Sequence, residues 1–169
     1  MSRITARRHA FNLIYQFPFH PDVDVEGIAR LKADYYDFLD EAGLAEYGLV
    51  GLRRPKGGDT AYIDNVVWGV FDKQNWLDKV IENFLQDWTL ERISRIDLAI
   101  LRLAIYEMLR ELDVPPGVAI NEAVELAKIY GTDESPAFIN GVLGNVAREM
   151  LQFRERSGHK AVKQGAGRG

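Results

Sequence analysis

The sequence of 169 residues contains no cysteine. Disulfide bonds, catalysis by a thiolate and sulfur-rich zinc sites are therefore excluded, and the composition fits the reducing cytoplasm, where we expect the protein to act. No stretch of about 18 consecutive apolar residues is present, so we expect no membrane span. The N-terminal segment does not resemble a secretory signal, because Pro18, Pro21 and Asp22 interrupt any apolar run.

Residues that could form a catalytic or metal site are scattered. His9, His20 and His159 have no second ligand type three or four positions away, which is the usual spacing of a helical metal site. The glycine clusters lack the spacing and the lysine of a phosphate-binding loop. No nucleophile stands beside a base in a known motif, and single carboxylates are usually solvated. We therefore predict a binding protein rather than an enzyme, with no metal and no cofactor.

Alternating β-branched and aromatic residues, which indicate strands, are also absent. Apolar residues recur instead at positions i, i+3 and i+4, which predicts amphipathic helices. Hydrophobic residues make up 47% of the chain, which is enough for one core. The sequence predicts an all-α protein of about seven helices. We expect one compact domain over residues 1–153 and a flexible basic tail over residues 154–169, disordered from Ser157.

The predicted helices follow from apolar stripes and from residues that begin or end a helix. Their approximate ranges are 4–17, 24–42, a third helix capped by Asp59-Thr60, a fourth after Asn75, 89–112, 118–130 and a seventh capped by Ser135. Residues 43–58 contain five glycines and a proline and are predicted to form a surface loop.

Three features refine this prediction. On the first helix His9 falls on the polar face, and on the fourth Trp88 completes an inward apolar stripe. The fifth helix is apolar on nearly every side over residues 96–109, so we expect it at the centre of the fold. Gly131 is predicted to end the sixth helix with a left-handed backbone.

The net charge of −4 is unevenly distributed. Residues 1–21 carry +3 and residues 154–169 carry +4, so the middle of the chain carries −11. Salt screens charges beyond about 10 Å, so a basic patch on an acidic protein can still bind phosphate. Arg3, Arg7 and Arg8 stand near the start of the first helix without an acid, which indicates phosphate contact. Solvated surface is the commoner role of any single arginine.

Asp97 and Phe138 are unusual for their positions. Asp97 opens the most hydrophobic helix, where an unpaired buried charge would cost several kcal/mol. It either caps that helix or faces solvent, or it faces a partner protein. Phe138 lies about 100° from the buried stripe of the seventh helix. It either belongs to the edge of the core or can stack on an unpaired base.

These residues belong to segments that resemble one known family. The segments DLAILRLAIYE at 97–107, VAINEAVELAKIYG at 118–131 and FINGVL at 138–143 resemble the C-terminal half of NusB. Ala6-Arg7-Arg8 with Tyr15 resembles its arginine-rich first helix. The resemblance is specific over residues 90–145 and collinear over residues 3–17 and 60–90.

The resemblance implies two roughly perpendicular three-helix bundles. It also implies a non-catalytic transcription antitermination factor that binds boxA-type leader RNA together with NusE, a ribosomal small-subunit protein. Such a factor acts in the RNA polymerase antitermination complex and promotes transcription of rRNA. The residues implied in RNA binding are Arg3, Arg7, Arg8, Glu134 and Phe138. The residues implied in NusE binding are Tyr15 and Asp97.

Two alternatives stay open on the sequence alone. One is the RNA-binding domain of an rRNA methyltransferase, of which this chain would be a fragment. The other is a protein-interaction scaffold or homodimer of the same fold with weak RNA binding. Phe19, Tyr35, Tyr36 and Trp76 could supply the dimer surface. Residues 43–58 look like an insertion relative to the family.

Overall fold

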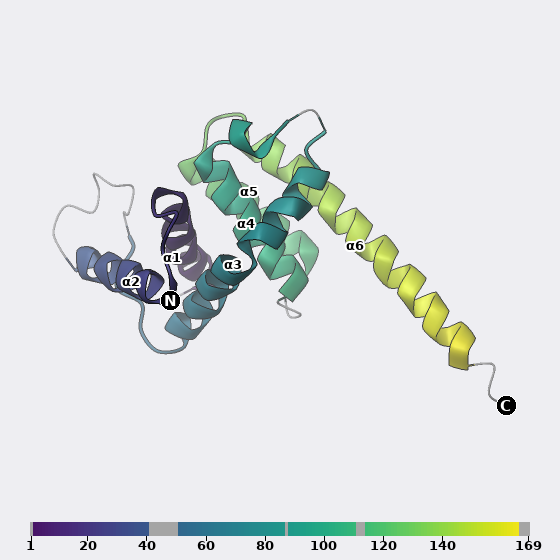
Figure 1. Ribbon diagram of the computed structural model, residues 1–169, viewed down its shortest axis with the longest axis horizontal. Helices are drawn as coiled ribbons and strands as arrows, with labels where there is room; N and C mark the ends of the chain where they lie inside the picture. The colour runs from purple at the N-terminus through teal and green to yellow at the C-terminus, as the bar shows by residue number, and fades with distance from the viewer. Residues whose placement is uncertain (1, 41–50, 87, 111–113, 166–169) are drawn as a thin grey trace.

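The computed structural model describes residues 2–40, 51–86, 88–110 and 114–165, the last thirteen of these by their backbone alone. Within these ranges the chain forms helices and no strand, which confirms the all-α prediction (Figure 1). The α-helices are α1 (Arg3–Tyr15), α2 (Val25–Leu39), α3 (Gly58–Asn83), α4 (Arg95–Arg110), α5 (Pro116–Tyr130) and α6 (Ser135–Gly165). Two short 3-10 helices, η1 (Phe17–Phe19) and η3 (Leu90–Arg92), lie between them.

Helix α4 lies at the centre of the molecule, as its sequence predicts. Every residue from Ala99 to Met108 is buried. The helix contacts α1, α3, α5 and α6. It therefore belongs to two groups of three mutually packed helices, α1–α3–α4 and α4–α5–α6. The perpendicular arrangement of two bundles stays a prediction.

The sequence predicts about seven helices, and the described ranges form six α-helices, because the third and fourth predicted helices are one. Helix α3 runs through Asn75 without a break, since no proline or capping geometry interrupts it there. The predicted cap at Asp59-Thr60 is also wrong: Gly57 precedes the helix, and the Thr60 hydroxyl donates to the Gly57 carbonyl. The helix ends at Asn83, so Trp88 leaves the predicted inward stripe and is 58% exposed.

Other helix ends also differ from the predictions. Helix α4 begins at Arg95 rather than Thr89, with the Ser94 hydroxyl accepting a hydrogen bond from the Asp97 amide. Gly131 ends α5 with φ −88°, which is not left-handed. Glycine is favoured at position 131 because a larger residue does not fit: an added Cβ would overlap the Ser135 side chain. The Ser135 hydroxyl accepts from the Thr132 amide, so it closes the preceding turn instead of capping α6.

The predicted surface loop and tail need correction as well. Residues 41–50 lie outside the described ranges, but Leu52 is 1% exposed and Pro55 is buried, so part of the loop contributes to the core. Helix α6 continues to Gly165, where a disordered tail was predicted from Ser157. No proline interrupts this stretch, and a single glycine costs a helix only about 1 kcal/mol. In Figure 1 this part of α6 extends away from the other helices.

Polar contacts within the core join the helices. Arg102 of α4 donates to both carboxylate oxygens of Asp78 on α3, at 2.8 and 2.9 Å. His9, predicted on a polar face, is fully buried, and its Nδ1 lies 2.9 Å from the Tyr35 hydroxyl. Burial lowers the pKa of His9 to about 4, so the ring is neutral at physiological pH. His9 therefore belongs to the structure of the core.

Candidate functional site

The three arginines near the start of α1 point to different neighbours. Arg3 is exposed, and its guanidinium carbon lies 4.0 Å from the centre of the Tyr62 ring on α3. Arg8 is half-buried and donates through Nε to the Tyr130 hydroxyl of α5 at 3.2 Å. Arg3 and Arg8 therefore lie on two sides of α1, and each is accessible enough to contact a phosphate.

Arg7 does not share this location. Its residue is 5% exposed, and its Nε lies 3.1 and 3.0 Å from the two carboxylate oxygens of Glu107 on α4. The Tyr62 hydroxyl donates to the same carboxylate, and Glu122 of α5 lies 3.9 Å from the guanidinium. Burial raises the pKa of Tyr62 well above its usual range, so the phenol keeps its proton. These contacts favour a structural role for Arg7 over RNA binding.

Three predicted site residues meet at one cavity, where the segment after α3, the start of α4 and the start of α6 come together. Asp97, Glu134 and Phe138 all line this cavity, which has a volume of about 240 Å³. The remaining lining residues are Trp88, Arg92, Ile93, Ser94, Thr132 and Ser135. Asp97, implied in NusE binding, is therefore a neighbour of Glu134 and Phe138, implied in RNA binding, which their separation in sequence does not reveal.

Asp97 has an unusual environment in this cavity. The Asp97 backbone amide donates a hydrogen bond to the Ser94 hydroxyl. Ser94, and not the Asp97 side chain, therefore caps α4. Its Oδ1 is buried and has no hydrogen-bond partner among the described residues. A buried acceptor without a donor costs free energy that a bound donor would recover. The capping interpretation of Asp97 is therefore wrong, and the interpretation that it faces a partner stays a prediction.

Tyr15 is connected to the start of α4 through one exposed aromatic residue. The Tyr15 ring lies 5.4 Å from the Phe19 ring, in an edge-on contact. The Arg95 guanidinium carbon lies 4.4 Å from the centre of the same Phe19 ring. Phe19 is 49% exposed, and no sequence pattern predicts its contact with Arg95. Among the four residues considered for a homodimer surface, Trp76 is also exposed, whereas Tyr35 and Tyr36 are buried.

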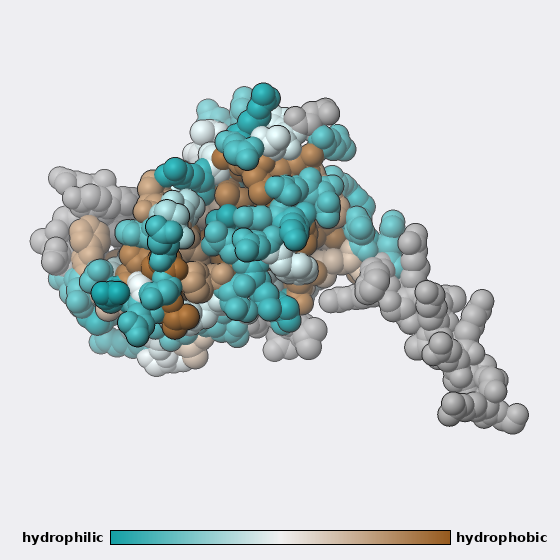
Figure 2. Space-filling view, viewed as in Figure 1, coloured by the Kyte–Doolittle hydropathy of each residue, from teal (hydrophilic) through white to brown (hydrophobic). Residues whose placement is uncertain are grey.

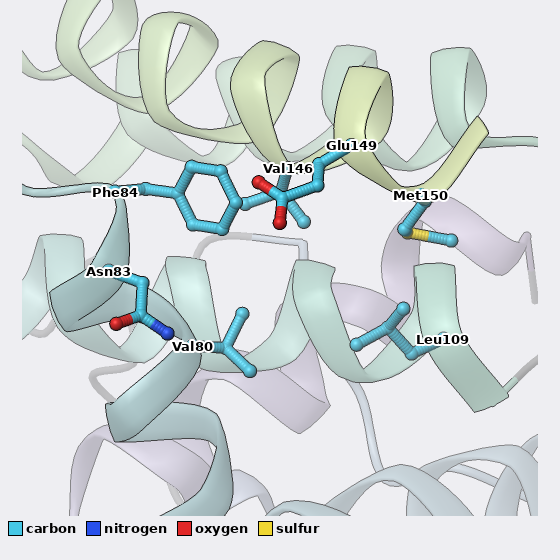
Figure 3. A pocket seen from close by; sticks show the side chains of 7 residues that line it. All are labelled: Val80, Asn83, Phe84, Leu109, Val146, Glu149 and Met150. Carbon is cyan, nitrogen blue, oxygen red and sulfur yellow. The ribbon is translucent and has the colours of Figure 1, made fainter. Parts of the chain in front are cut away.

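A second cavity, of about 330 Å³, lies between the ends of α3 and α4 and the middle of α6 (Figure 3). The side chains of Val80, Leu109 and Met150 point into it, and the Glu149 carboxylate lies at its edge.

The surface of the molecule is mixed in polarity: Figure 2 shows hydrophobic side chains between hydrophilic ones on the face drawn. No helix among the described residues is long and apolar enough to span a bilayer.

The fold and the first cavity define an all-helical binding protein in which aromatic and charged side chains converge at a helix junction. The described ranges contain no group of three or more side chains arranged to hold a metal ion. A sequence model of the NusB family matches residues 4–148, which is most of the chain, and the protein belongs to the NusB family.

Two individual relatives of this chain are named as members of the same family. The chain is 52% identical over 156 residues to transcription antitermination protein NusB of Clostridium tetani, covering 89% of this chain and 100% of the relative. It is 45% identical over 151 residues to transcription antitermination protein NusB of Acetivibrio thermocellus, covering 89% and 92%. Neither relative is named as a methyltransferase, so the comparison favours antitermination over the methyltransferase alternative.

Solved structures share the fold. The chain is similar to T. maritima NusB with a TM-score of 0.71 and 31% sequence identity, covering 88% of this chain and 92% of that one. It also has the fold of a chain in a structure of antitermination factors NusB and NusE in complex with dsRNA. There the TM-score is 0.67 at 20% identity, covering 87% and 96%.

Proposed function

We propose that this protein is a cytoplasmic transcription antitermination factor, without catalytic activity, that binds boxA-type leader RNA together with NusE. The observation that carries the proposal is the cavity shared by Asp97, Glu134 and Phe138, in a chain of the NusB family. Its walls combine an aromatic face for a base with polar groups for a base edge or a protein partner. The related complex of NusB, NusE and RNA supports the same partners.

The proposal divides the site residues between two ligands. Arg3 and Arg8 contact RNA phosphates, and Phe138 and the neighbouring Glu134 contact bases. Tyr15 and Asp97 face NusE, with the exposed Phe19 ring between α1 and Arg95 extending that surface. Arg7 supports α1 from within the core and does not touch the RNA.

The direct test is the binding of a labelled boxA RNA by the isolated protein and by its mixture with NusE. We expect weak binding alone and stronger binding with NusE, and poor competition by a scrambled RNA of equal length. Sedimentation of the same samples measures whether the protein is a monomer. Absence of RNA binding in both samples, from folded protein, would contradict the proposal, and a stable dimer would then favour the scaffold alternative.

The arginine assignment makes a separate prediction. Arg3→Ala combined with Arg8→Ala is expected to weaken RNA binding and to reduce the slope of log K against log salt by about 1 to 2, because each lost phosphate contact with a single strand accounts for about 0.7. Binding titrations at several salt concentrations measure this slope. The matched control is Lys73→Ala with Lys79→Ala, which removes the same charge from α3. Equal slopes for both double variants would contradict the assignment.

A further inference from the structure

The segment that precedes α3 carries cations to which the family resemblance assigns no role. It belongs to the stretch that looks like an insertion, and its described part begins at Gly51. Leu52 is 1% exposed and Pro55 is buried, so two residues anchor the segment in the core. The side chains between and after these anchors are exposed, and three of them are cationic: Arg53, Arg54 and Lys56. The anchors therefore hold three cations at the surface of the molecule.

The three cations differ in their partners. Arg54 donates to Asp37 and Asp40 at the end of α2, at 3.2 and 2.7 Å, so its charge is balanced there. Arg53 and Lys56 form no ion pair with any residue that the structure describes.

These side chains surround an open hollow of about 640 Å³ between the end of α2 and the start of α3. Its acidic residues are Asp40, which Arg54 binds, and Asp59. Asp59 is half-buried in the first turn of α3, where the helix dipole stabilises a negative charge. Arg53 and Lys56 are therefore the two cations of this hollow that can meet a phosphate.

The segment lies beside the arginines of α1. Burial lowers the pKa of His9, and the backbone of Arg53 opposes this effect, so Arg53 lies next to the residue that follows Arg8. Lys56 precedes α3 by two residues, and the Tyr62 ring that Arg3 covers at 4.0 Å stands about 6 Å along that helix. Figure 1 likewise draws the N-terminal end of α1 beside the start of α3.

Arg8 connects this segment with the candidate site at the start of α6. Its Nε donates to the hydroxyl of Tyr130, the last residue of α5, four positions before Glu134. The surface thus continues from Glu134 through Arg8 to Arg53. A single strand of RNA carries a phosphate at every nucleotide, so a strand that leaves the candidate site along α1 would meet these cations in turn.

We propose that Arg53 and Lys56 form a second contact surface for RNA phosphates, which holds the nucleotides that adjoin the boxA element at one of its ends. This inference rests on the proposed RNA binding and assigns the inserted segment a role in it. Phosphate contacts set position and carry no sequence information, so the surface lengthens the bound RNA without changing the preferred sequence. Because Leu52 and Pro55 already fix the segment, little ordering opposes binding.

Extension of the RNA tests this surface directly. Labelled boxA RNA is compared with the same RNA extended at either end by about six uridines, a length within one single-strand site. Fluorescence anisotropy in the presence of NusE gives the affinities at several salt concentrations. We expect one extension to raise the affinity of the wild-type protein about tenfold at about 0.1 M salt. The slope of log K against log salt should steepen by about 1.4, because each of two phosphate contacts with a single strand accounts for about 0.7.

Variants assign this gain to the two cations. Arg53→Ala combined with Lys56→Ala is expected to abolish the gain and to leave the affinity for the unextended RNA unchanged. Arg53→Lys combined with Lys56→Arg keeps both charges and should retain the gain, which separates an effect of charge from a structural one. The matched control, Lys73→Ala with Lys79→Ala, removes the same charge from α3 and should also retain it. Circular dichroism should show unchanged helicity in all three.

The outcomes distinguish this inference from the proposed function. If the wild type binds boxA RNA but gains nothing from either extension, the second contact surface is overturned and the proposed function stands. A gain that survives Arg53→Ala with Lys56→Ala has the same meaning. Loss of NusE binding in that variant, with the gain retained, would overturn the RNA contact and assign the segment to a protein partner. Failure of the wild type to bind boxA RNA with or without NusE would overturn both proposals.

Discussion

Replacing Glu107 by alanine is expected to lower the free energy of unfolding by about 3–5 kcal/mol, because it leaves a charge buried without its partner. Glu107 is 1% exposed and accepts from Arg7 and from the Tyr62 hydroxyl, so the substitution removes the acceptor on which α1 and α3 converge. Urea denaturation of the wild type and the variant, with equal m-values, measures the difference.

Two further proteins make this measurement specific. Glu125→Ala breaks an exposed pair with Lys128 within α5 and is expected to cost less than about 1 kcal/mol. Arg7→Met combined with Glu107→Leu removes both buried charges and is expected to be more stable than Glu107→Ala. If Glu107→Ala and Glu125→Ala destabilise the protein equally, the Arg7–Glu107 contact is not a core interaction.

Gly69→Ala is expected to destabilise the protein by about 2 kcal/mol. Alanine stabilises a helix by about 1 kcal/mol relative to glycine, but overpacking a core costs up to about 3 kcal/mol. A Cβ at Gly69 would overlap the ring of Tyr106, whose movement is restricted because its hydroxyl donates to Asn65 at 3.0 Å. The steric effect therefore exceeds the gain in helix propensity.

Gly141 of α6 provides the matched control. An added Cβ there meets no atom within 4 Å, so Gly141→Ala is expected to stabilise the protein by about 1 kcal/mol. Thermal or urea denaturation of both variants should show changes of opposite sign. Stabilisation by Gly69→Ala would mean that α3 and α4 are not packed closely at Tyr106.

The sequence predicts the helices well where an apolar stripe is long and continuous. The central position of α4 follows directly from its run of apolar residues, because such a helix must be covered on several sides. Helix ends are predicted less well, because local residues compete with tertiary packing. Asp59 and Thr60 have the right chemistry for a cap, yet the chain begins α3 at Gly58. Leu52 lies in a glycine-rich stretch but is drawn into the core.

The candidate site shows a similar limit. The sequence singles out Asp97, Glu134 and Phe138 individually, but only the fold brings them to one cavity. The charge pattern groups Arg7 with Arg3 and Arg8, since nothing local indicates its contact with Glu107, a hundred positions away. The apolar stripe of α3 predicts that Trp88 belongs to the core, but the helix ends at Asn83 and Trp88 is no longer held on that stripe.

The shared cavity also has a thermodynamic consequence. Asp97, Glu134 and Phe138 line one cavity, so under the proposed assignment RNA and NusE would bind at overlapping edges of one site. Thermodynamic linkage then makes the effect reciprocal. If bound NusE increases the affinity of the protein for RNA by some factor, bound RNA increases its affinity for NusE by the same factor. A nascent transcript carrying the RNA element would thereby recruit NusE from solution, and the assembly would respond to the concentration of either ligand.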